Sequence, residues 1–279
     1  MMDLIANLIS GLSLGSIYAL IALGYTMVYG IAKMLNFAHG DIIMVGAFAV
    51  ITTVSMLGFP PALAIAASVV CCVVLGVCVE RIAYKPLRKS PPLAVLITAI
   101  GVSYFLQSLA LLIFGSTQHS FPKVFSVPTL ALGALTIRGD MLVTLAVTTA
   151  IMVGMSLFIA KSRTGKAMRA VSEDMDAARL MGINVNSTIS FTFAVGSALA
   201  GIGSVLYCCS YPQATPTMGS MLGLKAFVAA VLGGIGSIPG AMIGGIAAAE
   251  IISHYGARAE VSLRGFARNR LRAYGKSFS

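Results

Sequence analysis

The feature that most constrains this chain is a series of long apolar runs separated by short polar segments. The runs are Leu4–Ile31, Gly40–Leu57, Pro61–Val79, Pro92–Phe114, Met141–Ala160 and Ser187–Cys209, followed by a broken apolar region at Lys225–Ser253. A helix needs about 20 mainly apolar residues to cross the hydrocarbon core of a bilayer. The pattern therefore predicts an all-α fold, a polytopic bundle of transmembrane helices with a broken or re-entrant helix near the C-terminus.

Composition excludes a soluble domain. Hydrophobic residues make up 58% of the chain and charged residues 10%, whereas soluble domains carry about 25% charged residues. The first run is too long for a signal peptide and lacks a positive leader. The net charge of +10 comes from basic residues dispersed over loops, which is typical of cytoplasmic loops and predicts no nucleic-acid partner.

The five cysteines all lie in apolar runs, at Cys71, Cys72, Cys78, Cys208 and Cys209. No histidine stands beside them at ligand spacing, so the sequence predicts neither a metal site nor a redox pair. We expect them to be buried as small hydrophobic residues. Small residues four apart, at Gly11/Gly15, Gly196/Ala200 and Gly236/Gly240/Gly244, favour close packing inside the bundle over a subunit interface.

Basic residues are unevenly divided between alternate loops. One set of loops holds Lys33, Arg81, Lys85, Arg88, Lys89, Lys161, Arg163, Lys166, Arg169 and Arg179, and the other set holds Lys123, Arg138 and Lys225. Because cytoplasmic loops are enriched in lysine and arginine, the first set is predicted to be cytoplasmic. The N-terminus is then predicted to lie outside.

Residues 164–185, "TGKAMRAVSEDMDAARLMGINV", form a charged island in this apolar chain. Ser172 is expected to cap a short helix there, and Gly182 fits the left-handed position after its end. The charged positions are Glu173, Asp174, Asp176 and Arg179, and the apolar ones are Met175, Ala178 and Met181. From the residues alone, this helix is either a solvated loop or a docking surface.

A family resemblance favours the docking surface. The stretch "GKAMRAVSEDMDAARLMGIN" resembles the cytoplasmic coupling loop of ATP-binding-cassette importer permeases of the branched-chain amino acid type. In that family the helix docks onto a separate ATPase subunit. The resemblance assigns this role to Gly165, Lys166, Arg169, Glu173, Asp174, Ala178, Arg179 and Gly182. The chain has no G-x-x-x-x-G-K-[ST] motif, so we expect no nucleotide, no cofactor and no enzymatic activity of its own.

The N-terminal stretch "GLSLGSIYALIALGYTMVYGIAKMLNFAHGDIIMVGAF" resembles the same family. Asn36, His39 and Asp41 are polar groups next to an apolar span, where they are expected to be capped, paired or functional. One interpretation makes Asp41 the N-cap of a helix over Ile42–Leu57, with Asn36 and His39 satisfying exposed backbone. The other places all three on a translocation path.

The stretch "GLKAFVAAVLGGIGSIPGAMIGG", residues 223–245, also resembles the family. Gly234, Gly236 and Pro239 break the helix, and irregular backbone at membrane depth is tolerated only beside protein or a water-filled cavity. We therefore expect two half-helices beside the translocation path. Gln107 and Glu250 are the remaining intramembrane polar candidates for that path.

The resemblance extends over residues 1–253, which we predict to be the permease domain, with the coupling loop at 161–186. Residues 254–279 are rich in arginine, serine and alanine and resemble a replaced C-terminal end. If 225–253 enters and leaves on the outer side, this basic tail lies outside, against the positive-inside rule. If 225–253 crosses once, the tail lies inside, near anionic lipid.

The resemblance implies a permease subunit of a binding-protein-dependent importer for branched-chain or similar small amino acids in the bacterial inner membrane. Its expected partners are two ATPase subunits, a second related permease, an external periplasmic binding protein and membrane lipid. The alternatives are a secondary transporter or channel acting without an ATPase, and a truncated remnant that does not transport. A lone transporter would usually carry several ionisable residues at mid-membrane, and this chain has few.

Overall fold

The computed structural model describes residues 2–88, 90–124, 128–132, 135–234, 237, 240–241 and 243–247. Its helices are α1 (Met2–Ala32), α2 (His39–Ile51), α3 (Pro61–Val79), α4 (Pro92–Phe114), α5 (Gly139–Lys161), α6 (Arg163–Glu173), α7 (Met175–Leu180), α8 (Val185–Ser210) and α9 (Met218–Leu232). Two π-helical segments, η1 (Thr52–Met56) and η2 (Glu80–Tyr84), extend α2 and α3. Two short antiparallel pairs join β1 (His119–Ser120) to β4 (Gln213–Ala214) and β2 (Leu130–Leu132) to β3 (Leu135–Ile137).

The predicted spans are confirmed. Within the described residues, six helices are long and apolar enough to cross a membrane: Ser10–Ala32, His39–Met56, Pro61–Tyr84, Pro92–Phe114, Gly139–Lys161 and Val185–Ser210. Each coincides with one predicted apolar run to within a few residues. Pro61 and Pro92 stand at the first position of their helices, where the missing N–H removes no intrahelical bond. The architecture is a polytopic helical bundle.

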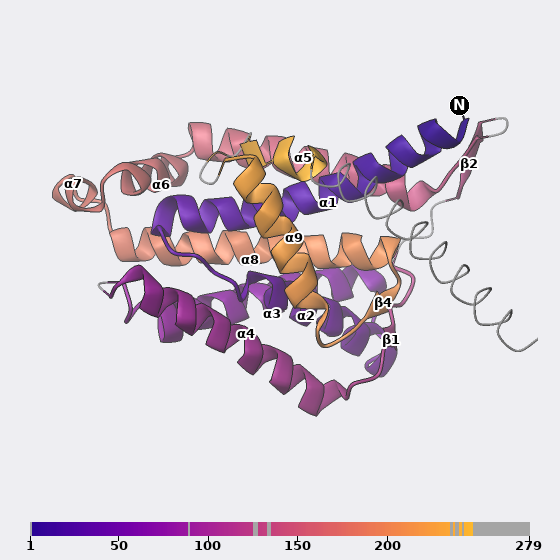
Figure 1. Cartoon of the computed structure of the whole chain (residues 1–279), viewed down its shortest axis with the longest axis horizontal. Helices are drawn as coiled ribbons and strands as arrows, with labels where there is room; N and C mark the ends of the chain where they lie inside the picture. Colours follow the sequence, from indigo (N-terminus) through magenta and orange to yellow (C-terminus); the bar gives the residue numbers. More distant parts are fainter. Residues whose placement is uncertain are drawn as a thin grey trace, which may run out of the picture.

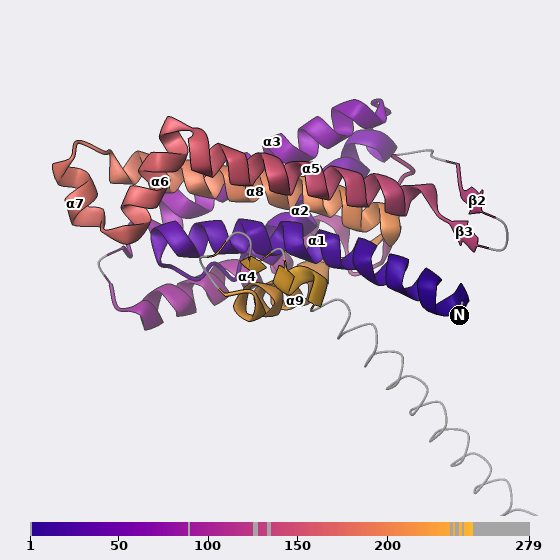
Figure 2. The ribbon, with the colours of Figure 1, turned by 90° about the horizontal axis from the view of Figure 1, so that it is seen from above.

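The bundle is organised around α1. Of its spanning window 83% is buried, against 17% for α4 and 22% for α5. Helix α8 packs against both α1 and α2, and α5 and α9 also pack against α1, whereas α4 lies at the edge of the bundle (Figures 1 and 2). Ile17, Leu20 and Phe193 are among the fully buried side chains of the centre. The outer helices therefore expose their apolar side chains, such as Leu112 and Phe105 of α4, as a lipid-facing surface requires.

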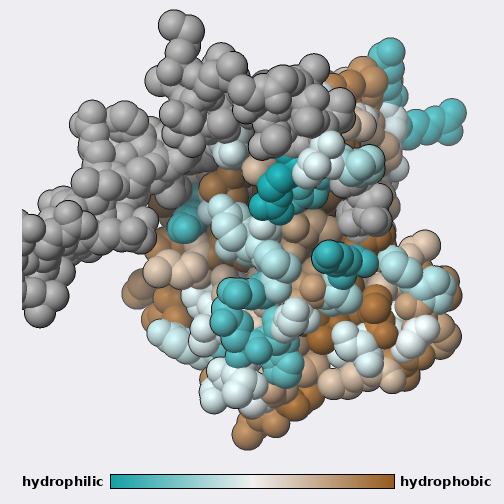
Figure 3. Space-filling view, turned by 90° about the vertical axis from the view of Figure 1, so that its right-hand side faces the viewer, coloured by the Kyte–Doolittle hydropathy of each residue, from teal (hydrophilic) through white to brown (hydrophobic). Residues whose placement is uncertain are grey.

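The two ends of the bundle differ in charge. Helices α6 and α7, the α1–α2 connection and the α3–α4 connection lie at one end (left in Figure 1), with the basic residues of the predicted cytoplasmic set that the structure describes. The opposite end carries the strand pairs. Seen from there, hydrophilic side chains gather in the middle and hydrophobic ones toward the edge (Figure 3). Lys225 was wrongly counted with the outer loops: it lies within α9, its Nζ 6.0 Å from the centre of the Tyr18 ring.

The seventh apolar region is a broken helix, as predicted, although it begins already at Met218. With 15 residues, α9 is about 22 Å long and too short to span; it lies steeply across α1 and α2 on one face (Figure 1). The helix ends at Leu232, and Gly234 follows with φ +87°. Ser237 Oγ then accepts a hydrogen bond from the Gly240 N–H at 3.2 Å, and helical backbone resumes at 240–241 and 243–247.

The chain doubles back after this break. A Cβ at Gly233 would lie 1.9 Å from the Gly240 carbonyl oxygen, and one at Gly244 would lie 2.2 Å from that of Ala229. The second half therefore runs antiparallel to α9, in contact through glycine backbone. Of the predicted small-residue pairs, Gly196 likewise lies against α1, beside Gly24, in agreement with packing inside the bundle.

The crossing of α2 and α9 is the closest helix contact near the predicted path. A Cβ at Gly40 would lie 2.1 Å from the Gly219 carbonyl oxygen and 2.8 Å from the Gly223 Cα. No side chain other than hydrogen fits such a contact, because real Cβ atoms do not approach backbone so closely. Glycine at these three positions lets the two helices touch backbone to backbone.

The prediction that all five cysteines are buried is correct for only some of them. Cys72 and Cys208 are buried, Cys209 is half-buried, and Cys71 and Cys78 are exposed on α3. The exposed pair lies on a lipid-facing side, where a small hydrophobic residue needs no protein cover. No group of three or more potential metal ligands occurs among the described residues.

We predict that Gly40→Ala destabilises the protein, because the new methyl group would displace α9. Overpacking costs about 1–3 kcal/mol, which is a fall in melting temperature on the order of 5 °C. Gly154→Ala is the matched control, since this exposed helical glycine of α5 has no atom within 4 Å of a Cβ. Thermal unfolding of both variants in detergent measures the effect. Equal melting temperatures for the two would contradict the described crossing.

Candidate coupling loop and translocation site

The charged island folds as two helices, not one. Helix α6 begins after Ser162, whose Oγ accepts from the Gly165 N–H at 2.8 Å. Met168 and Val171 face inward and are fully buried. A Cβ at Gly165 would lie 2.5 Å from the backbone of Ile159, so α6 folds back closely on the end of α5. Gly165 is thus a packing residue of the loop.

Helix α7 is capped by Asp174, which corrects the prediction that Ser172 is the cap. Asp174 Oδ1 accepts from the N–H groups of Asp176 at 2.8 Å and Ala177 at 3.0 Å. These donors hold the pKa of Asp174 below its usual value, because they stabilise the ionised form. Ser172 instead lies in the last turn of α6, and its Oγ donates to the Arg169 carbonyl oxygen.

The end of α7 follows the prediction. Arg179 lies in its last turn and pairs with Asp176 at 2.7 Å. Gly182 has φ +82°, the left-handed conformation that favours glycine after a helix. The Gly182 N–H donates to the Arg179 carbonyl oxygen, and the Ile183 N–H to that of Ala178. The loop is therefore ordered on both sides of α7 by its own hydrogen bonds.

The loop divides its side chains between bundle and solvent. Ala178 is buried, whereas Lys166, Arg169, Glu173 and Arg179 are exposed. The Arg169 guanidinium donates to the Ala160 carbonyl oxygen at 3.1 Å. Two of the three most exposed large apolar side chains among the described residues are at the end of α7: Leu180 is 89% and Met181 82% exposed. Met181 was predicted on an apolar side of this helix, whereas Leu180 was not singled out in the sequence.

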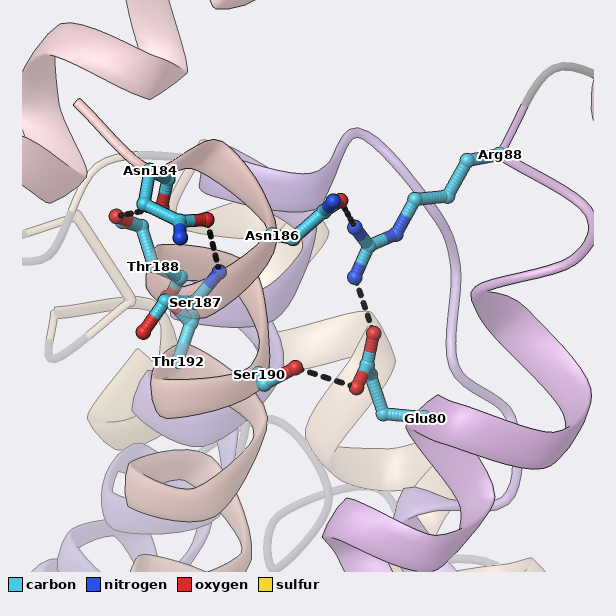
Figure 4. A network of polar contacts seen from close by, with 8 residues as sticks. All are labelled: Glu80, Arg88, Asn184, Asn186, Ser187, Thr188, Ser190 and Thr192. Atoms are coloured by element: carbon cyan, nitrogen blue, oxygen red, sulfur yellow. Dashed lines mark hydrogen bonds and ion pairs between the residues drawn. The ribbon is translucent and has the colours of Figure 1, made fainter. Parts of the chain in front are cut away.

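A second polar group, overlooked in the sequence, ties the base of this loop to the bundle. Glu80 of η2 is fully buried; it forms an ion pair with Arg88 and accepts from Ser190 Oγ at 2.6 Å (Figure 4). Arg88 also donates to Asn186 Oδ1. The network joins the end of α3, the connection to α4 and the first turns of α8. The available sequence signal was an acid at the end of an apolar run with an arginine eight residues later.

The predicted path residues Asp41 and Gln107 are brought together by the fold. Gln107 Nε2 donates to Asp41 Oδ1 at 3.0 Å and to Ser103 Oγ at 3.0 Å. Asp41 is therefore not an N-cap: α2 begins at His39, its N-cap position is Ala38, and no side chain caps it. The carboxylate is instead paired across helices, from α2 to α4.

Asn36 and His39 lie beside the same helices but have other neighbours. Asn36 Oδ1 accepts from the Tyr84 hydroxyl of η2 at 2.9 Å, and the His39 ring meets Tyr25 edge to face, with centroids 4.7 Å apart. Both residues are almost fully buried. Neither side chain satisfies the exposed backbone of a turn, so that interpretation is wrong for both.

Several buried polar atoms in this region have no hydrogen-bond partner within the described residues. They are Tyr25 Oη, Thr26 Oγ1, Asn36 Nδ2, His39 Nε2 and Asp41 Oδ2. A buried polar atom without a partner costs about 1–3 kcal/mol, and buried groups are nearly always bonded to protein, water or ligand. Their concentration around α1 and the start of α2 marks this region as the polar interior of the bundle.

The remaining predicted path residues belong to the broken helix. Gly234 marks its break, as described above. Gly236, Pro239 and Glu250 lie outside the described residues, as does the predicted tail at 254–279.

Comparison with known proteins identifies relatives over most of the chain. Residues 7–257 match the family model described as branched-chain amino acid transport system, permease component. The chain is 44% identical to the high-affinity branched-chain amino acid transport system permease protein BraD of Pseudomonas aeruginosa, and 44% identical to LivH, the protein of that description in Escherichia coli; each alignment covers 86% of this chain and 82% of the relative. A probable branched-chain amino acid transport permease of Methanocaldococcus jannaschii is 30% identical, over 82% of this chain and 74% of its own length.

We predict that Arg88→Ala destabilises the protein far more than Arg81→Ala, an exposed arginine of the same segment. Removing Arg88 leaves the buried Glu80 carboxylate without its counter-charge, which costs about 3–5 kcal/mol. The double variant Glu80→Gln/Arg88→Ala should recover much of the loss, because no charge then stays buried. Thermal unfolding in detergent measures all three. A double variant no more stable than Arg88→Ala would show that the ion pair is not the cause.

Proposed function

The chain belongs to the family of branched-chain amino acid transport system permeases, and on that premise we propose that it is a membrane subunit of an ATP-driven importer. Its substrates are branched-chain or similar small amino acids, as the names of its relatives state for those proteins. ATP is hydrolysed by separate subunits, and this chain, itself no enzyme, provides part of the path. The complex lies in the inner membrane.

The observation that carries this proposal is the exposed apolar end of α7. Leu180 and Met181 are exposed at the end of α7, which lies at the basic end of the bundle beyond the ends of the spans. Large apolar side chains held in water on an ordered helix are typical of a protein contact. Glu173, Asp176 and Arg179 are exposed charged residues of the same loop, and interfaces typically have such a polar rim around an apolar centre. The partner proposed for this surface is the ATPase subunit, one for each permease.

The loop is built to move with the bundle. Met168 and Val171 bury α6 against the spans, and α7 leads into α8 through Gly182 with only a short connection. The first turns of α8 are tied to α3 and α4 through Asn186, Ser190 and the Glu80–Arg88 pair. A force on α7 therefore reaches three spans through packed or hydrogen-bonded contacts.

The translocation path is proposed to run beside the polar interior. Asn36, His39, Asp41 and Gln107 lie there, and α9 crosses α2 beside Asp41; irregular backbone such as that at Gly234 is tolerated beside a path, which supports the proposal. Gly236, Pro239 and Glu250 are proposed to continue it. A second related permease completes the path opposite this chain, an external periplasmic binding protein delivers the amino acid, and lipid covers the outer helices.

The alternative is a transporter or channel that works without an ATPase. Uptake of radiolabelled leucine into proteoliposomes separates the two, with this chain reconstituted alone and together with the second permease, the binding protein and the ATPases. We expect uptake only in the complete assembly supplied with ATP. Uptake by the chain alone, independent of ATP, would favour the alternative, and a complete assembly that hydrolyses ATP without uptake would favour a remnant.

We predict that Leu180→Ser/Met181→Ser weakens binding of the ATPase at least about tenfold, because an interface centre of two large apolar residues is worth more than 1.4 kcal/mol. The melting temperature should not change, since both side chains are already in water. Thr164→Ala, an exposed position of α6, is the control. Co-purification of the ATPase with each variant measures binding. Unchanged binding by the double variant would remove the proposed role of α7.

A further inference from the structure

A pocket of about 220 Å³ opens between α1, α4 and α9, beside the buried Asp41. Its wall includes Tyr25, Phe37, Ser103, Tyr104, Gln107 and Leu224. Drug-sized ligands occupy pockets of about 300–1,000 Å³, so this volume suits a smaller molecule. The pocket lies on the face that α9 crosses, next to the polar interior described above.

The side-chain amide of Gln107 is held in one orientation by its hydrogen bonds, so that its oxygen is available as an acceptor. Gln107 is 9% exposed, and its Nε2 donates to Asp41 and to Ser103, so both of its N–H donors are used within the protein. An ionised carboxylate can only accept, so Asp41 fixes which end of the amide faces it. The amide oxygen of Gln107 is left with no hydrogen bond within the described residues.

Tyr25 adds a second polar atom without a partner. Its side chain is 4% exposed, and its hydroxyl makes no hydrogen bond within the described residues. The hydroxyl lies close to the α2–α9 crossing, 3.5 Å from where a Cβ of Gly223 would stand. A polar atom this deeply buried in the wall of a pocket is satisfied when a ligand or water occupies that pocket.

The charged and polar groups of the wall favour a ligand group of positive charge. The lining residues include no lysine, arginine or histidine, so a carboxylate or phosphate would find no counter-charge there. The acceptor oxygen of Gln107, the negative Asp41 behind it and the faces of Tyr25 and Tyr104 all favour a cation that donates hydrogen bonds. A primary ammonium group has this chemistry.

The rest of the wall is apolar. Phe37, Ile100, Leu224 and the ring of Tyr104 line it, and these side chains offer dispersion contacts to an aliphatic group. An ammonium group joined to a branched aliphatic chain matches both sides of the pocket at once.

We propose that this pocket is a transit site that binds the ammonium end and side chain of a branched-chain amino acid. Gln107 and Tyr25 contact the ammonium group, and Asp41 acts through Gln107 as a positioning residue. The inference rests on the proposed function, since it names how one part of the path recognises the substrate. It assigns to this chain a selectivity of its own, in addition to that of any external binding protein.

The test uses the assembly of both permeases and ATPases in lipid nanodiscs, without the binding protein. Saturation-transfer difference NMR detects weak binding of three probes: L-leucine, 3-methylbutylamine, which lacks the carboxylate, and 4-methylpentanoate, which lacks the ammonium group. We expect leucine and the amine to bind and 4-methylpentanoate to bind at least about tenfold more weakly. Equal binding of 4-methylpentanoate and leucine would overturn the proposal, and this comparison needs no variant to fold.

Variants then locate the site. Gln107→Leu and Asp41→Asn should each weaken leucine binding at least about tenfold, whereas Thr98→Val, at a polar position of α4 outside the pocket lining, should not change it. If Asp41→Asn does not fold, Ser103→Ala replaces it in this test, because Ser103 Oγ is the other acceptor that holds the Gln107 amide. If all variants bind as the unchanged assembly does, the pocket is not the site. ATP-driven leucine uptake by that same assembly would then leave the proposed function standing while this inference fails.

Discussion

The backbone contact between α2 and α9 is the interaction on which the described site depends. Gly40 meets Gly219 and Gly223 with no room for a side chain, and Asp41, the next residue, is thereby held against both α9 and α4. In a membrane, apolar surface alone does not bring helices together, because lipid is as apolar as leucine. Close backbone packing at glycine supplies the association, and it brings the pocket wall contributed by α9 up to the polar groups of α1 and α4.

Hydrogen bonds between helices then give this packing its specificity. Asp41–Gln107 joins α2 to α4, Asn36–Tyr84 joins the α1–α2 connection to η2, and Glu80–Ser190 joins η2 to α8. Each pairs groups that would be costly to leave unpaired in hydrocarbon. Polar atoms that stay without a partner are concentrated at α1 and the start of α2, next to these bonds. Among the described residues, five of the eight such atoms lie where a path is proposed, and the other three belong to Arg88, Thr144 and Ser210.

Sequence periodicity and length predicted the spans, the break near Gly234 and the turn at Gly182, because these depend on local chemistry. The partners of Asp41 and Glu80 could not be predicted, since Gln107 and Ser190 are brought to them only by the packing of distant helices. The prediction of the residue that caps α7 was wrong for a different reason: Ser172 and Asp174 are two residues apart, and serine and aspartate are both good N-caps. Only the position at which α6 ends, at Glu173, decides between them.

The charged loop formed by α6 and α7 is joined to the pocket by the contacts that hold the bundle together. Glu80 and Tyr84 both belong to η2; the first is bonded to the base of α8, which follows this loop, and the second to Asn36, just before α2. Continuity in space does not itself make two sites coupled, because coupling also needs an element with two arrangements. The end of α9 is best suited to that role: the helix stops at Leu232, Gly234 has φ +87°, and Gly240 and Gly244 of the returning segment pack on the backbone of α9, which lines the pocket.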